Sequence, residues 1–263
     1  MLSDMNNIEQ LAEKVSYYNN SKFLYGNIIE YDIKAANINM LKKYNAIDNN
    51  YYHYLSNLPK KDREVIVGKL ISSDNHYHDI ISSGIKEAKI KLFQSNKLTE
   101  DDIVRIANDA VYTINKELQY IKFDLIEFKK KSNFTSALKL NNLFILFNSN
   151  TNDMDIIGIN DINISLHANY ILSIIAQIII LLERGSIKDA LNFLSTFYES
   201  YINLELDMNF YRELNADSGF RYKNIPFLFS QTPDCKDLKE VDIGYNIYIL
   251  RELFSIILSY YRY

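Results

Sequence analysis

The spacing of apolar residues changes along this chain, and the change limits the folds it can adopt. Asn27–Ile33 is a short, β-branched run of the kind found in strands. Pro59–Ser95 then carries apolar residues at helical spacing, and its first proline suits the start of a helix. Short apolar runs return at Asp102–Ala107 and Val111–Ile114. Strands on both sides of a helical segment predict an α+β fold, with a small mixed or antiparallel sheet and an inserted helical segment.

The chain after about residue 160 is predicted to be mainly helical. Tyr170–Leu182 is its most apolar stretch, but Gln177 interrupts it and it is shorter than the roughly 20 residues of a membrane span. We therefore expect a buried helix there and no membrane association. A further aromatic and aliphatic helix is expected over Ile243–Tyr260.

These patterns predict how the chain divides into regions. Residues 1–160 form an α+β region, with a helical insert at about 43–98. Residues 161–263 form a helical region that packs on it, so that the chain is one compact unit.

Composition excludes several classes of protein. With 7 glycines and 3 prolines, the chain argues against a glycine-rich dinucleotide-binding fold. Its single cysteine, Cys235, rules out an internal disulfide and a cysteine-based zinc cluster. A net charge of −4 gives no overall attraction to nucleic acid, so such binding requires a local basic patch. The polar first residues predict no secretory signal and hence a cytoplasmic protein.

Two aspartates occupy positions where carboxylates can meet. Asp32 ends the first strand, and Asp109 lies at the tip of the hairpin predicted from the two later apolar runs. A hairpin tip beside a strand end brings two carboxylates close, and a shared divalent cation keeps both ionised. With no His or Cys in these segments, the oxygen ligands favour Mg²⁺ or Mn²⁺. Such a pair suits two-metal phosphoryl transfer.

The same segments resemble template-dependent DNA polymerases. Asp32–Leu41, DIKAANINML, is similar to motif A, in which a strand-terminal Asp precedes a helix beneath the incoming nucleotide. Asn108–Tyr112, NDAVY, is similar to motif C, a hairpin whose tip carries the second metal-binding Asp. The helices between them occupy the position of polymerase fingers. The chain thus resembles a compact, phage-type polymerase palm over roughly residues 25–130.

The resemblance implies a function and a set of site residues. Asp32 and Asp109 would be the catalytic, metal-binding residues, and Arg63 and Lys69 would hold a nucleoside triphosphate. Lys34 is a weaker candidate for substrate binding, and Asn37 stands at the position that discriminates the sugar. The implied partners are a nucleic-acid primer and template, in the cytoplasm of a phage-infected host.

Departures from the polymerase motifs leave two alternatives open. Val111 replaces the second acid of the B-family motif C, and Asn108-Asp109-Ala110 replaces the A-family His-Asp-Glu. One alternative is a catalytically silent palm-like subunit of a replication or transcription assembly. The other is a helical phage or host interaction protein that binds a partner through its C-terminal helices. In that protein Asp32 would be a helix N-cap and Asp109 a turn residue.

Overall fold

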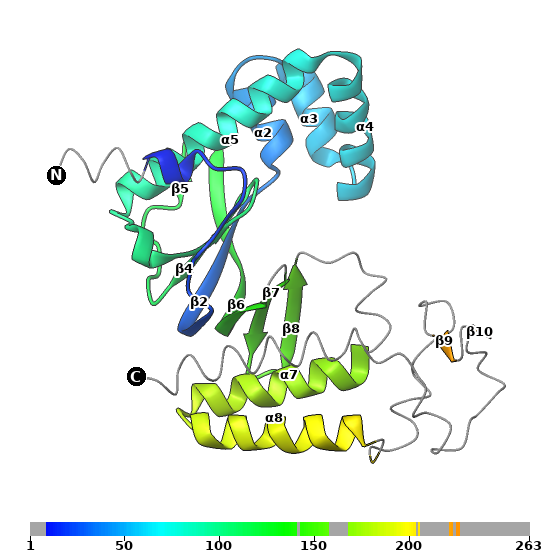
Figure 1. The fold of residues 1–263 in the computed structure, drawn as a ribbon. Coiled ribbons are helices and arrows are strands. Elements are labelled where there is room, and N and C mark those ends of the chain that lie inside the picture. The colour runs from blue at the N-terminus through cyan, green and yellow to red at the C-terminus, as the bar shows by residue number, and fades with distance from the viewer. Residues whose placement is uncertain are drawn as a thin grey trace. The chain divides into compact units, whose positions relative to one another are not determined.

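The computed structural model confirms a mixed α+β fold (Figure 1). It describes residues 9–140, 143–157, 168–203, 205, 221–222 and 225–226. The chain divides into two compact units. The first unit comprises Met1–Asn20 and Gly26–Asn133, and the second comprises Ser21–Tyr25 and Phe134–Tyr263.

The first unit is built on antiparallel strands in the order β1-β3-β4-β2-β6. A short strand, β5, pairs with the start of β6. The bounds are β1 Tyr17–Tyr18, β2 Phe23–Ile33, β3 Ile103–Ile106, β4 Ala110–Ile114, β5 Lys122–Phe123 and β6 Ile126–Leu140. Since strands β3 and β4 are consecutive and paired, residues 107–109 form the turn between them.

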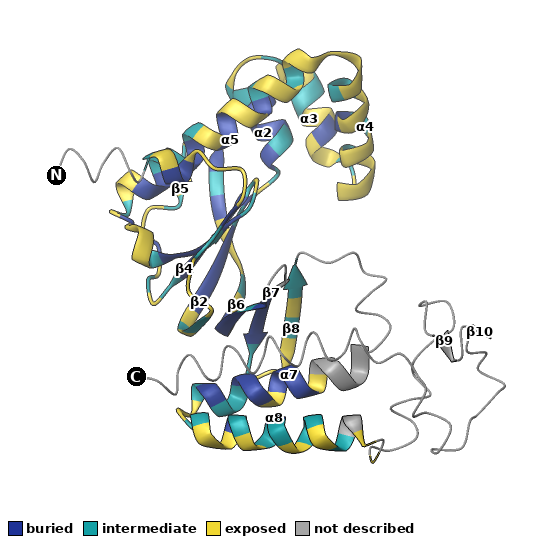
Figure 2. Ribbon diagram, viewed as in Figure 1, coloured by how far each residue is buried: buried dark blue, intermediate teal, exposed yellow. Residues whose placement is uncertain are grey.

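Four helices follow β2 in the first unit (Figure 1). They are α2 Ala36–Lys43, α3 Asn49–Asn57, α4 Lys60–Ser73 and α5 Asn75–Ser95, with a 3₁₀ turn at Glu100–Asp102 before β3. One face of the strands contributes Ile29, Tyr31 and Val111 to the same buried core as Leu41 of α2 and Leu92 of α5. Figure 2 shows this buried stripe along α2 and α5.

Alternation along β2 separates that core from the opposite face of the sheet. Ile29, Tyr31 and Ile33 belong to the core cluster, so Glu30 and Asp32 project from the other side. The strand thus gives one face to packing and the other to polar chemistry.

Helix starts follow the local sequence. Pro59 directly precedes α4, and the Asp74 side chain accepts a hydrogen bond from the His76 backbone N–H at 2.8 Å at the start of α5. Helix α3 was not predicted, although the Asp48 side chain caps it by accepting from the Tyr51 N–H at 2.7 Å. Its composition, NNYYHYLSN, carries few aliphatic residues to reveal helical spacing.

Two sequence-based assignments in the first unit were wrong. The helical spacing of Leu11, Ala12 and Val15 predicts a helix over Asn6–Tyr18. In the structure residues 9–12 are helical, whereas Tyr17–Tyr18 form β1 and pair with Ile106 and Arg105. Pairing with the edge of β3 therefore overrides the helical periodicity at this end. The near alternation of Ile121, Phe123 and Leu125 predicts a strand over Tyr120–Phe128. In the structure Asp124 has a φ of 53° and separates β5 from β6.

The second unit combines the later strands with two helices. Strands β6, β7 Leu143–Asn148 and β8 Asp153–Ile157 are antiparallel neighbours. The apolar residues of Leu138–Phe147 predict a strand there, but the run falls on two strands, β6 and β7, whose register pairs Leu140 with Leu143. A short hairpin of β9 Arg221–Tyr222 and β10 Ile225–Pro226 lies later in the chain.

Helices α7 Ala168–Glu183 and α8 Ile187–Ile202 pack side by side (Figure 1). The expected buried helix is confirmed, because Ile175, Ile178 and Ile179 of α7 are buried. Gly185, with a φ of 70°, separates the two helices. Within the described part of the chain, no helix combines the length and apolar character that crossing a membrane requires. The helix expected over Ile243–Tyr260 lies outside the described residues.

Close packing of α5 against α2 gives a test of the first unit. A Cβ at Gly84 would lie 2.7 Å from Met40 Sδ and 2.9 Å from Tyr44 Cε2. We expect Gly84→Val to lower the free energy of unfolding by about 1–3 kcal/mol, because the helices must separate to admit the side chain. Chemical denaturation followed by circular dichroism measures this change.

Gly68 in α4 is the matched control, because a Cβ there meets no atom within 4 Å. Gly68→Ala should instead stabilise the protein by roughly 0.5–1 kcal/mol through helix propensity. Equal effects of both substitutions would contradict the close α2–α5 packing.

Candidate functional site

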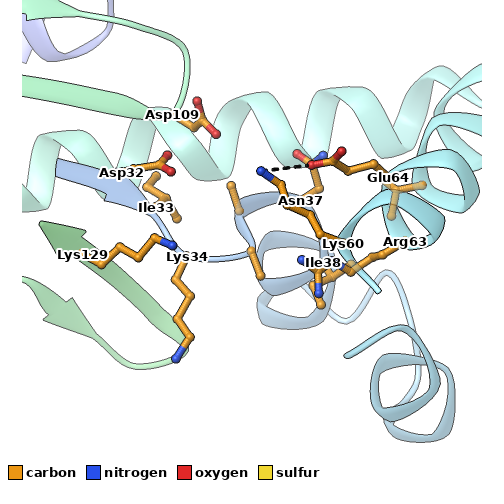
Figure 3. Close-up of a pocket in the computed structure, with 13 residues that line it drawn as sticks. Asp32, Ile33, Lys34, Asn37, Ile38, Lys60, Arg63, Glu64, Asp109 and Lys129 are labelled. Atoms are coloured by element: carbon orange, nitrogen blue, oxygen red, sulfur yellow. Dashed lines mark ion pairs between the residues drawn. The ribbon is translucent and has the colours of Figure 1, made fainter. Parts of the chain in front are cut away.

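The register of β2 against β4 brings Asp32 and Asp109 together. Asp32 is paired with Ala110, the residue that follows Asp109. The Ile33 backbone N–H also donates a hydrogen bond to the Asp109 carbonyl oxygen at 3.0 Å. The end of β2 is thereby tied directly to the β3–β4 turn. Figure 3 shows both carboxylates at one end of a shared pocket.

The charge of Asp109 acts on the Asp32 carboxylate. The pKa of Asp32 is raised above its ordinary value, first by burial and then by repulsion from Asp109. Lys131 and Lys129 act in the opposite direction, and Glu30 adds a further repulsion. The site thus holds negative charge at a free-energy cost that a bound cation would relieve.

The pocket has a volume of ≈ 270 Å³ and lies wholly within the first unit. Its lining comes from the end of β2, the start of α2, one face of α4, the β3–β4 turn and β6. The charged and polar residues that line it are Asp32, Lys34, Asn37, Lys60, Arg63, Glu64, Asp109 and Lys129. Five of the six site residues predicted from the sequence are among them.

Lys69 is the predicted residue that does not line this pocket. It follows Arg63 by six residues, which is about 240° around a helix at 3.6 residues per turn. Lys60 precedes Arg63 by three residues and does line the pocket, where it pairs with Glu64 at 3.6 Å (Figure 3). Helix α4 therefore presents Lys60 and Arg63 to the site as its two cations.

Lys34 and Asn37 occupy the turn from β2 into α2. Ala35 between them has a left-handed backbone, with φ 48° and ψ 45°. Lys34 is exposed and pairs with Glu127 at 3.6 Å. Its side chain points away from the two aspartates in Figure 3. Asn37 lies in the first turn of α2 and lines the pocket, where a bound substrate could contact it.

Sequence reasoning missed the lysines of β6. Lys129 lines the pocket, and Lys131 forms an ion pair at 2.9 Å with Glu30, whose side chain is 5% exposed. Glu30 also accepts a hydrogen bond from the Tyr112 hydroxyl at 3.0 Å, so its carboxylate is held by two partners. A lysine at alternate positions of a strand signals one charged face. Lys129 and Lys131 lie beyond Phe128, where the strand predicted from the sequence ends.

Lys89 on α5 is the second missed cation. Its side chain is buried at 2% exposure, and its ammonium donates a hydrogen bond to the Lys14 carbonyl at 2.7 Å. Burial lowers the pKa of Lys89 to about 8, and the charge of Asp109 opposes that shift. The ammonium therefore lies near enough to the β3–β4 turn to offset part of its negative charge.

The donor set at the pocket fits a magnesium ion bound together with a substrate. Within the described ranges, no three Asp, Glu, His or Cys residues converge as a metal-ligand cluster. The pocket lining includes three carboxylates, of which Glu64 pairs with Lys60. Among the lining residues, all of which the structure describes, Asp32 and Asp109 are the two carboxylates that form no ion pair with a lysine of the lining. Mg²⁺ is commonly held by one or two carboxylates, with waters and substrate phosphates completing its shell. Asp32 and Asp109 could supply the carboxylates for such an ion, and Lys60 and Arg63 could contact the substrate phosphates.

Comparison with known proteins gives one family. The family model described as "Bacteriophage PBS1 gene 130 protein" matches residues 5–259, nearly the whole chain. No curated protein sequence matches the chain. The match supports the phage origin implied by the sequence resemblance.

The raised pKa of Asp32 predicts how stability depends on pH. A carboxyl whose pKa is higher in the folded protein than in the unfolded chain destabilises the fold increasingly as pH rises through that interval. Asp32→Asn removes this penalty, so we expect a higher Tm than wild type at about pH 7, by a few degrees. The difference should shrink as the pH approaches about 4. Thermal unfolding across this range measures it.

Asp79→Asn, at an exposed position on α5, is the control and should leave Tm within about one degree of wild type. A Tm of Asp32→Asn below that of wild type at neutral pH would contradict the electrostatic account of the site.

Proposed function

The chain belongs to the bacteriophage PBS1 gene 130 protein family, and we propose that it is a polymerase-like nucleotidyltransferase of palm type. It would extend a nucleic-acid primer on a template, in a minimal or subunit form, in the cytoplasm of the infected host. The observation that carries the proposal is the meeting of Asp32 and Asp109 in one pocket with Lys60 and Arg63.

The proposed reaction transfers a nucleotidyl group to a primer hydroxyl. The oxygen of the primer 3′-hydroxyl forms a bond to the α-phosphorus of a nucleoside triphosphate. The bond from that phosphorus to the β-phosphate bridging oxygen breaks, pyrophosphate leaves, and the hydroxyl proton passes to solvent. Positioning and charge stabilisation supply most of the acceleration in such reactions.

Each pocket residue has a role in this proposal. Arg63 suits bidentate contact with phosphate oxygens, and Lys60 adds a second positive charge beside it. Asp32 and Asp109 would hold Mg²⁺ or Mn²⁺, which would supply positive charge to the reacting phosphate when bound. Asn37, at the start of α2, would face the sugar of the incoming nucleotide.

A catalytically silent palm-like subunit is the second candidate function. Val111 stands where B-family motifs carry a second acid, and its side chain is fully buried in the core. That position therefore offers no carboxylate to the pocket. A silent subunit would bind nucleic acid or an assembly partner without incorporating nucleotides. An interaction protein that uses its C-terminal helices would show no nucleic-acid affinity at all, even at low salt.

Nucleotide incorporation tests the proposal directly. We expect the full chain to extend a labelled primer on a template in the presence of Mg²⁺ or Mn²⁺ and nucleoside triphosphates. Asp32→Asn and Asp109→Asn should each lower the rate by at least about 100-fold, because one carboxylate cannot hold the metal ions alone. Product length on a sequencing gel measures extension.

Asp79→Asn serves again as the exposed-carboxylate control, and thermal unfolding shows that each variant is folded. Nucleic-acid binding without incorporation, unchanged by both site substitutions, would favour the silent subunit. Absence of binding at low salt would leave the interaction protein.

Helix α4 supplies a second test, since it separates two basic residues that the sequence could not distinguish. We expect Arg63→Ala to raise the KM for the nucleoside triphosphate by about 10- to 100-fold, through loss of charge-assisted hydrogen bonds to phosphate. Steady-state incorporation kinetics measure the KM and kcat separately.

Lys69→Ala is the matched control, because Lys69 lies on α4 outside the pocket lining. It should change the KM less than about twofold, the size of a screened surface charge. A larger effect at Lys69 than at Arg63 would show that another face of α4 meets the substrate.

A further inference from the structure

A row of side chains crosses the first unit beside the two aspartates. Strand registers pair Glu30 of β2 with Tyr112 of β4, Tyr112 with Arg105 of β3, and Arg105 with Tyr18 of β1. Residues directly opposite each other in antiparallel strands share a face of the sheet. Because Glu30 and Asp32 are two residues apart on β2, the whole row lies on the face that carries Asp32.

Arg105 lies at the centre of this row between two tyrosine rings. Its guanidinium carbon is 5.0 Å from the ring centroid of Tyr112 and 5.5 Å from that of Tyr18. These contacts hold the planar group in a fixed orientation and at little cost in side-chain entropy on binding. Ring contacts use the face of the guanidinium, so its N–H groups still require hydrogen-bond acceptors.

One donor of the Arg105 guanidinium, its Nε, is buried and lacks an acceptor among the residues that the structure describes. None of the ion pairs within the described part of the chain includes Arg105. The carboxylate in the same row, Glu30, is engaged by Lys131 at 2.9 Å and by the Tyr112 hydroxyl at 3.0 Å. A buried donor without an acceptor is costly and indicates a missing partner.

We propose that Arg105 binds a backbone phosphate of the nucleic acid, upstream of the primer end that reacts at Asp32 and Asp109. This inference rests on the proposed function. A phosphate supplies the acceptor oxygens that a guanidinium fork matches, and phosphate contacts fix a strand in register without reading its sequence.

The position of Arg105 agrees with an upstream phosphate. From Asp32 to Arg105 the sheet runs two strands across and two residues along, which is roughly 12 Å at normal strand spacings. That separation is too long for contact with a nucleotide reacting at Asp32. It agrees with contact to a phosphate further along a strand bound at the site.

The test measures binding of a fluorescent primer–template duplex to the full chain, without metal or nucleotides, across a series of salt concentrations. We expect Arg105→Gln to weaken binding several-fold at low salt and to reduce the slope of log affinity against log salt by about one. Arg105→Lys keeps the charge but loses the fork, so it should retain the slope with intermediate affinity. Thermal unfolding monitors the integrity of each variant.

Lys130→Gln is the matched control. It removes one positive charge from β6, between Lys129 and Lys131 and so on the opposite face, where Lys130 pairs with Glu117 at 3.4 Å. Its salt slope should equal that of wild type. An unchanged slope in Arg105→Gln, or equal losses in both variants, would overturn the proposal.

A second measurement uses wild-type protein and so does not depend on a variant folding. Primers that carry a single neutral methylphosphonate at successive positions should show one upstream position at which binding to wild type drops. Arg105→Gln, if folded, should lose that position-specific drop. Equal binding to every modified primer would overturn the proposal.

The binding assays separate this inference from the proposed function. If Arg105 contacts a phosphate but the chain incorporates no nucleotide, the proposed enzyme activity is wrong and the Arg105 phosphate site belongs to a silent nucleic-acid-binding subunit. If the chain incorporates nucleotides but Arg105→Gln has the wild-type slope of log affinity against log salt, the enzyme proposal stands and the Arg105 phosphate site is wrong. A wild-type chain that binds no duplex at low salt would overturn both.

Discussion

The antiparallel register between β2 and β4 is the constraint on which the candidate site depends. Pairing of Asp32 with Ala110, together with the hydrogen bond from the Ile33 N–H to the Asp109 carbonyl, fixes the strand end against the β3–β4 turn. A slip of one residue would turn Asp32 into the core and the core residues outward. The apolar face of β2, which is buried against α2 and α5, therefore holds the two aspartates in place.

The site is costly to maintain, and its surroundings offset part of that cost. Burial and mutual repulsion raise the pKa of Asp32, while Lys131, on the neighbouring strand, lowers it. Lys89, on α5, lies near the charge of Asp109, and its burial deprives its own ammonium of water. A cation bound between the two aspartates would relieve the repulsion between them, as the proposed metal-dependent reaction requires.

The helical insert contributes the positive side of the pocket. Helices α2 and α5 pack closely at Gly84, so the insert continues the core of the first unit. This packing positions α4, whose start carries Lys60 and Arg63 into the pocket. On the sheet face that carries Asp32, the row containing Arg105 extends positive charge away from the aspartates. These are the features on which the proposed contacts with a triphosphate and with nucleic acid depend.

The sequence by itself determined the α+β class, the hairpin that carries Asp109 and the strand end that carries Asp32. These features are local, since hydrophobic periodicity and turn residues specify them within a few positions. Only the tertiary structure decided which cations share the pocket with the aspartates. Lys60 rather than Lys69 lines the pocket because of how α4 is rotated about its axis. The surroundings of the Arg105 Nε, which lacks an acceptor among the described residues, depend on strands distant in sequence. Long-range pairing likewise made Tyr17–Tyr18 a strand, because edge hydrogen bonds outweighed local helical spacing.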